Sequence, residues 1–134
     1  MPFIASEYNI APGRENTAVA GLSMGGREAL YIGLTLQDEI GYVGAFSPAP
    51  GVIAYEAEGG LIPKEDMKVK DGYDTLVLIM TGLTDTTVGA WPKTYADVLT
   101  ENGTDVIYYE SIGAHDFFTW KNGLYNFAKL LFRD

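Results

Sequence analysis

A serine and a histidine in this sequence are placed as nucleophilic catalysis requires. Ser23 lies in "GLSMG", a Gly-x-Ser-x-Gly pattern whose glycines allow a sharp turn that presents the serine hydroxyl. A serine nucleophile needs a base, and the chain contains one histidine, His115, in "GAHDF". Taken alone, "GLSMG" also fits an ordinary glycine-rich turn, and a lone histidine also fits a structural loop residue.

An acid that orients the histidine is expected between the two, in the order Ser, Asp, His. We expect Asp85 to be this acid, because it follows the apolar run "TLVLIM". Asp116 adjoins His115, and neighbouring side chains seldom face each other well enough, while Asp74 precedes its strand and so lies at the wrong end. Ser23 would then attack an ester carbonyl, with His115 moving the proton and Asp85 fixing the imidazole tautomer. The alternative for Asp85 is a capping or turn aspartate.

The elements that must position these residues alternate between strands and helices. Short apolar runs predict strands at 17–22, 42–47, 75–80 and 105–111, and helical periodicity predicts helices at 24–36, 91–101 and 120–132. This alternation indicates an α/β fold, a single domain over 1–134 with about four mostly parallel strands and flanking helices. The expected catalytic residues all follow strands, so they should meet at the carboxyl edge of the sheet. Met24 opens a helix there, and we expect its N–H to bind an oxyanion.

The segment 49–72 is rich in charge and glycine, and we interpret it as a long loop or lid insertion with one short helix. Two interpretations of its apolar residues remain open. In the first interpretation, an aromatic acyl pocket is lined by Tyr55, Leu61 and Ile62. In the second, these residues make the ordinary packing contacts of a lid.

Composition excludes several classes of function. The 134 residues carry a formal net charge of −9, which disfavours binding to nucleic acid or to anionic membranes. The chain has no cysteine, which excludes thiol catalysis, and a single histidine excludes a His-cluster metal site. The expected site therefore contains no metal. A phosphate-binding loop is excluded because "GLSMGGRE" lacks the Lys-Ser/Thr pair of that motif.

Three segments, "GLSMGG", "GLTDTTVG" and "GAHDFFTWKNGLYNF", resemble the esterase-D-like α/β hydrolases. The likeness is greatest to carbohydrate esterase family one, the feruloyl and acetylxylan esterases, and spans about residues 2–132. It implies Ser23, Asp85 and His115 as nucleophile, acid and base, an ester substrate often carried on plant polysaccharide, no cofactor, and secretion. Trp120 matches a family position near the base, where it contacts substrate or serves as a core aromatic.

The resemblance implies that this chain corresponds only to the carboxyl-terminal half of the family's domain. The strand from Thr17 to Leu22 would then lie at a sheet edge without its neighbour, and an apolar edge invites pairing. We expect self-association, or a missing amino-terminal half that binds there and supplies a second oxyanion donor. Within the enzymes, siderophore-ester and thioester hydrolysis are alternatives. Outside them, the chain is an inactive fragment with a structural or carbohydrate-binding role.

Overall fold

A parallel four-stranded sheet forms the centre of the computed structural model, which describes residues 2–54 and 60–133. Its strand order is β1 (Ala18–Leu22), β2 (Tyr42–Phe46), β5 (Leu76–Gly82), β6 (Val106–Ser111). Every neighbouring pair is parallel, so the carboxyl ends of all four strands lie at one edge of the sheet. The predicted α/β class is confirmed, and each strand begins and ends within two residues of its predicted bounds.

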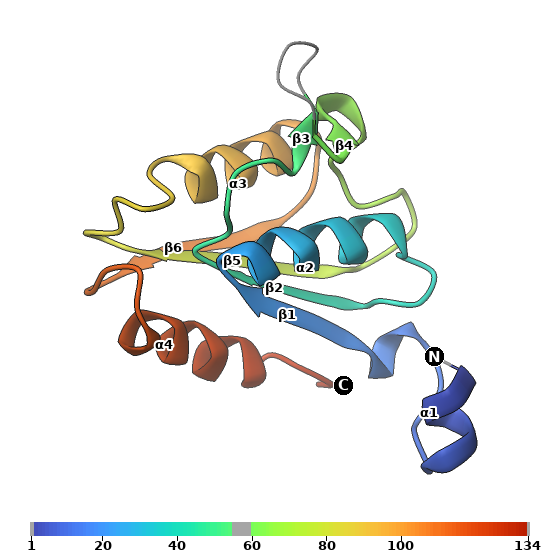
Figure 1. Cartoon of the computed structure of the whole chain (residues 1–134). Helices are drawn as coiled ribbons and strands as arrows, with labels where there is room; N and C mark the ends of the chain where they lie inside the picture. The colour runs from blue at the N-terminus through green and yellow to red at the C-terminus, as the bar shows by residue number, and fades with distance from the viewer. Residues whose placement is uncertain (1, 55–59, 134) are drawn as a thin grey trace.

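Helices cover both faces of the sheet (Figure 1). α2 (Met24–Thr35) and α3 (Trp91–Glu101) lie on one face, and α4 (Phe117–Ala128) lies on the other. Each face buries its own apolar cluster, one around Leu30, Ile79 and Leu99 and the other around Phe46, Met80 and Phe127. Three short elements complete the helices: α1 (Pro2–Glu7), with its described side chains exposed, and the 3₁₀ turns η1 (Arg14–Asn16) and η2 (Lys64–Asp66).

The last helix differs from the prediction of 120–132, because it runs from Phe117 to Ala128. It starts earlier because Asp116 caps it: the Asp116 carboxylate accepts a hydrogen bond from the Thr119 N–H at 2.9 Å. Phe127 of this helix is buried, whereas Leu124 is 54% exposed.

The described parts of the segment 49–72, residues 49–54 and 60–72, contain more regular structure than the expected loop. They contain a parallel pair of short strands, β3 (Ile53–Ala54) and β4 (Ile62–Pro63), followed by η2. Ile62 is buried in the cluster on the α2–α3 face, so it packs as a core residue, while Leu61 is exposed. Tyr55 lies outside the described residues. A lid function for this segment stays a prediction.

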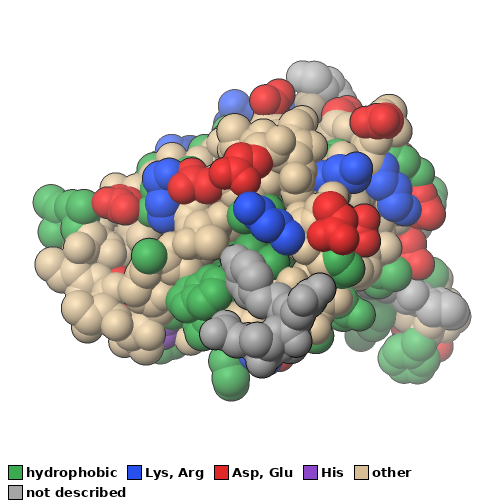
Figure 2. Space-filling view, turned by 90° about the horizontal axis from the view of Figure 1, so that it is seen from above, with side chains coloured by type: hydrophobic (Ala, Val, Ile, Leu, Met, Phe, Trp, Pro, Cys, Tyr) green, Lys and Arg blue, Asp and Glu red, His purple; other side chains and the backbone are tan. Residues whose placement is uncertain are grey.

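The surface above α2 and α3 carries acidic and basic side chains interspersed (Figure 2). At the side of the sheet, β1 pairs with β2 and is an edge strand of the described chain. The expectation of an edge at 17–22 is therefore confirmed. No helix among the described residues is long and apolar enough to cross a membrane.

Candidate active site

Ser23 occupies the tight turn between β1 and α2. Its backbone has φ 54° and ψ −119°, a conformation that serine seldom adopts. Three hydrogen bonds hold it: its N–H donates to the Phe46 carbonyl at 2.9 Å, and its carbonyl accepts from the N–H groups of Arg27 at 3.1 Å and Ala49 at 2.9 Å. Surroundings that over-determine a strained residue are typical of functional sites.

The two glycines of the motif differ in what they do. A Cβ at Gly21 would lie 2.2 Å from the Gly25 carbonyl oxygen, so a side chain there would push the strand away from the helix. A Cβ at Gly25 meets no described atom within 4 Å outside its chain neighbours and the nearby backbone of α2. A side chain is therefore sterically excluded at Gly21, whereas the contacts of Gly25 with the rest of the described chain do not exclude one.

The three expected catalytic side chains lie together at the carboxyl edge of the sheet. His115 Nε2 is 2.9 Å from Ser23 Oγ, and His115 Nδ1 is 2.8 Å from Asp85 Oδ2. Ser23 follows β1, Asp85 follows β5 and His115 follows β6. Parallel pairing of the strands therefore brings the three loops to one edge of the sheet, although Ser23 and His115 are 92 residues apart. A base between a hydroxyl and a carboxylate is the arrangement that proton transfer from serine requires.

Asp85 has a fully buried side chain whose two oxygens have separate partners. Oδ2 faces His115, while Oδ1 accepts hydrogen bonds from the N–H groups of Thr87 at 3.1 Å and Val88 at 3.4 Å. Asp85 is therefore a turn aspartate as well as a contact of His115, whereas the N-cap of α3 is Ala90. Burial by itself raises the pKa of Asp85. Hydrogen bonds from His115, Ser47 and the Val88 backbone lower this pKa by more than burial raises it, so the net pKa lies below the ordinary value.

Asp74 and Asp116, which are not expected to orient His115, have other partners. Asp74 pairs with Arg14 at 2.8 Å, before β5 begins, and Asp116 caps α4 instead of facing the imidazole ring. Asp85 is the acid that contacts His115.

Met24 is the first residue of α2, and its side chain is 63% exposed. The first N–H groups of a helix have no acceptor within the helix, so the Met24 N–H is positioned to donate to an anion next to Ser23. Its oxyanion role stays a prediction.

Trp120 packs against the base. Its indole meets the His115 ring edge to face, with centroids 4.9 Å apart, and also contacts the cluster around Phe46 and Phe127. It lines a cavity of about 260 Å³ together with Leu22 and other apolar residues. These contacts fit the core-aromatic interpretation, and substrate contact stays a prediction.

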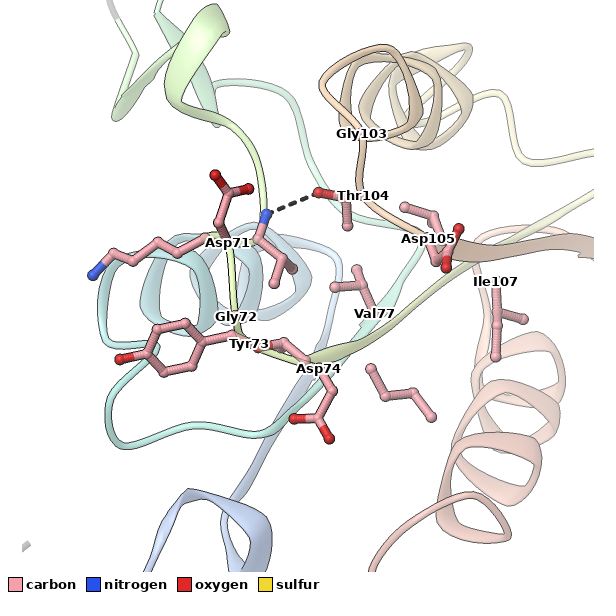
Figure 3. A pocket seen from close by; sticks show the side chains of 14 residues that line it. Asp71, Gly72, Tyr73, Asp74, Val77, Gly103, Thr104, Asp105 and Ile107 are labelled. Atoms are coloured by element: carbon pink, nitrogen blue, oxygen red, sulfur yellow. Dashed lines mark hydrogen bonds between the residues drawn. The ribbon is translucent and has the colours of Figure 1, made fainter.

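A second cavity, of about 570 Å³, lies at the opposite edge of the sheet (Figure 3). Its lining comes from 69–77 and 103–107, the segments that enter β5 and β6, and a hydrogen bond of 2.8 Å from the Val69 N–H to Thr104 Oγ1 closes one side. It is distant from the expected nucleophile, which follows the carboxyl end of β1. Within 2–54 and 60–133, no cluster of three or more histidine, cysteine, aspartate or glutamate side chains could hold a metal ion.

Sequence reasoning missed one residue of this site. Ser47 ends "YVGAFS" and falls within the predicted strand, yet it lies beyond β2 with a positive φ, and its hydroxyl lowers the pKa of the Asp85 carboxyl. The prolines that follow marked the turn, but nothing local indicates where the hydroxyl points.

Comparison with known proteins gives a family. Residues 1–128 match the family model "Esterase", described as "Putative esterase". The chain is 41% identical to a CE1 ferulic acid esterase from Anaeromyces mucronatus solved with ferulic acid, with a TM-score of 0.90. The match covers 98% of this chain and 50% of that one, so the chain spans about half the length of that esterase.

Two more distant structures share the fold. The enterochelin esterase of Shigella flexneri is 21% identical with a TM-score of 0.74, over 95% of this chain and 33% of that one. The S-formylglutathione hydrolase FrmB of Staphylococcus aureus is 17% identical with a TM-score of 0.67, over 93% and 54%. With the family match over nearly the whole chain, the α/β-hydrolase-type sheet and the serine turn between β1 and α2, we conclude that this chain belongs to the esterase family.

Proposed function

We propose that this chain carries the catalytic centre of a serine carboxylic-ester hydrolase, with Ser23 as nucleophile, His115 as base and Asp85 as acid. The observation that carries the proposal is the hydrogen-bonded series from Ser23 Oγ through His115 to Asp85, at 2.9 and 2.8 Å. Family membership supports it independently.

The geometry fits an acyl-enzyme reaction. His115 Nε2 takes the proton of Ser23 as Oγ forms a bond to the ester carbonyl carbon, and the carbonyl electrons move to oxygen. The Met24 N–H stabilises that oxyanion. The carbonyl re-forms as the alkoxide leaves with the proton from His115, and water then repeats the sequence to release the acid and restore Ser23. Asp85 keeps the Nδ1 proton in place throughout.

We propose feruloyl or acetyl esters on plant polysaccharide as substrates. The support is the 41% identity to a ferulic acid esterase solved with ferulic acid. Siderophore esters and thioesters are the alternatives, and the two neighbours under 25% identity share only the fold with this chain. Comparing kcat/KM for methyl ferulate, an aryl acetate, a catecholate trilactone and an acyl thioester separates these classes, and a preference for either of the last two overturns the proposal.

Hydrolysis of p-nitrophenyl acetate by wild type and Ser23→Ala tests the activity itself. We expect wild-type turnover above background and a Ser23→Ala rate equal to background, because the variant has no group to acylate. The matched control is Ser6→Ala, on exposed α1, with the wild-type rate. Equal rates for wild type and Ser23→Ala would favour the inactive fragment with a structural or carbohydrate-binding role.

We also propose that a polypeptide pairs along the β1 edge, either a second copy or a chain supplying the strands and second oxyanion donor of longer relatives. Its support is the edge position of β1 beside only partly buried side chains such as Val19 and Leu22. Sedimentation velocity and hydrogen exchange test it. A monodisperse monomer whose β1 amides are all protected would contradict the proposal, because no edge would then be open.

A further inference from the structure

A groove of about 470 Å³ lies between the carboxyl end of β6 and α4, outside the hydrogen-bonded series of Ser23, His115 and Asp85. Residues at the end of β6 and along α4 line it: Ser111, Ile112, Phe118, Lys121, Asn122 and Tyr125. Because β6 is the edge strand opposite β1, the groove lies toward the other side of the sheet from the edge where we propose that a polypeptide pairs.

The helix side of the groove presents two exposed aromatic rings. Phe118 is 67% exposed and Tyr125 is 64% exposed. The two residues are seven positions apart in α4, so they lie on one face of the helix, about 10.5 Å apart along its axis. Lys129 Nζ lies 4.4 Å from the centre of the Tyr125 ring, and this contact restrains the ring. Large rings left exposed in a row are typical of a surface that binds a ligand.

Two hydrogen-bond donors lie between the rings along the helix. Asn122 Oδ1 accepts from the Tyr109 hydroxyl at 3.1 Å and from Asn126 Nδ2 at 3.2 Å, so the amide is held with its oxygen occupied. Within 2–54 and 60–133, the Asn122 NH₂ group and the Lys121 ammonium group have no hydrogen-bond or ion-pair partner. These two groups are therefore available to a ligand that supplies acceptor oxygens.

One end of the groove borders the loop that carries His115. Ile112 and Phe118 are each three residues from His115, one before it and one after it. Ile112 is 80% exposed, and the Phe118 ring lies beside Gly113, where an added Cβ would be 3.5 Å from Phe118 Cδ1. A ligand that extends along the groove toward this loop therefore approaches the base of the proposed triad.

Aromatic rings in a row with donors between them are complementary to a chain of pyranose sugars. The C–H groups on one face of a pyranose ring fit against the negative face of an aromatic ring, and sugar hydroxyls accept hydrogen bonds from lysine and asparagine. Two linked pyranose rings are about as long as the separation of Phe118 and Tyr125, about 10.5 Å. Among the described residues, the lining contains no acidic side chain, although the chain has 18 aspartate and glutamate residues, so uronic acid branches are not repelled.

We propose that this groove binds the polysaccharide whose ester is presented to Ser23. Presentation of the ester rests on the proposed esterase function. Binding of the sugar chain does not, because the groove is complementary to it whether or not the protein turns over substrate. Phe118 and Tyr125 contact the sugar rings and no reacting atom.

The test measures binding of soluble arabinoxylan in the Ser23→Ala background, where ester cleavage does not interfere. Affinity electrophoresis in gels containing arabinoxylan gives Kd for this protein and for Phe118→Ala, Tyr125→Ala and Asn122→Asp added to it. Asn122→Asp keeps the acceptor oxygen and removes the NH₂ donor. The matched control is Tyr8→Ala, the same substitution at a tyrosine that is 66% exposed and lies outside the groove.

We expect arabinoxylan to retard the Ser23→Ala protein, with Kd rising roughly three- to tenfold in each groove variant and staying within about twofold in Tyr8→Ala. Both rings are exposed, so their removal leaves the fold intact, which circular dichroism checks. No retardation, or retardation equal in all variants, would overturn the proposal. A dimer that dissociates in Tyr125→Ala, seen by sedimentation velocity, would also overturn it, because a second copy would then cover the groove. Absence of Ser23-dependent hydrolysis would overturn the proposed function, while arabinoxylan binding still decides the role of the groove.

Discussion

Replacing Asp85 by asparagine tests the hydrogen-bonded series with the smallest change in shape. The wild-type carboxylate accepts on both oxygens: Oδ1 from the N–H groups of Thr87 and Val88, and Oδ2 from His115 Nδ1. Asparagine has a single acceptor oxygen. An amide NH₂ facing two N–H donors would lose both bonds, so the oxygen takes the Oδ1 position and the NH₂ faces His115.

This arrangement exchanges the tautomer of the His115 imidazole. With a donor opposite Nδ1, that nitrogen must accept, and the ring proton moves to Nε2, which faces Ser23 Oγ at 2.9 Å. A protonated Nε2 cannot take the serine proton. The same change in an established Ser-His-Asp triad lowers kcat by about 10⁴. At about 1.36 kcal/mol per decade this is about 5.4 kcal/mol of lost transition-state stabilisation.

The assay is release of p-nitrophenolate from p-nitrophenyl acetate near pH 7, with Ser23→Ala defining the background. Asp116→Asn is the matched control, because it is the same chemical change beside His115 in sequence. Asparagine caps helices as well as aspartate does, so the bond to the Thr119 N–H survives and kcat should stay within about twofold of wild type.

Two results would refute this reasoning. An Asp85→Asn variant that keeps more than about a tenth of wild-type kcat would show that the carboxylate does not set the tautomer. Equal losses in Asp85→Asn and Asp116→Asn would show that any charge change near His115 disturbs the site.

Three further predictions concern stability, each measured by urea denaturation. Gly21→Ala should destabilise the chain by about 1–3 kcal/mol, because its Cβ would lie 2.2 Å from the Gly25 carbonyl oxygen. Gly25→Ala should be neutral or slightly stabilising, because its Cβ meets no described atom within 4 Å outside its chain neighbours and the nearby backbone of α2. Equal losses in the two variants would contradict the steric argument. Phe127→Ala should cost about 3–5 kcal/mol, since this ring is 1% exposed and packs edge to face on Phe46; a loss below 1 kcal/mol would contradict its place in the core. The free energy of unfolding should fall as pH drops below about 4, because the folded-state pKa of Asp85 lies below its unfolded value and its contribution disappears as the carboxylate is protonated; a slope at acid pH that is no smaller in Asp85→Asn would contradict this assignment.

Much of the fold follows from local patterns. The apolar runs are as long as buried strands and are separated by helical periodicity, so the α/β class and the bounds of the four sheet strands, α2 and α3 follow closely from the chain itself. The last helix begins before its predicted start because Asp116, which precedes "FFTW", caps it, and periodicity alone does not include this start signal. The segment 49–72 is predicted as a loop because its few buried residues, such as Ile53 and Ile62, are separated by charged stretches and form no strand or helix pattern.

The candidate residues follow from the amino-acid sequence alone. A serine between glycines, a single histidine and an aspartate after a strand leave few combinations, and all three precede or follow elements with clear periodicity. Whether these side chains touch depends on distances across 30 and 92 residues, and only the register and packing of the sheet decide them. The same holds for Ser47, which lies beyond the end of β2 with a positive φ and whose Oγ lies 3.5 Å from Thr81 Oγ1 of β5. Hydrogen bonds need atoms about 3 Å apart in the correct direction, and no local pattern specifies that between distant residues.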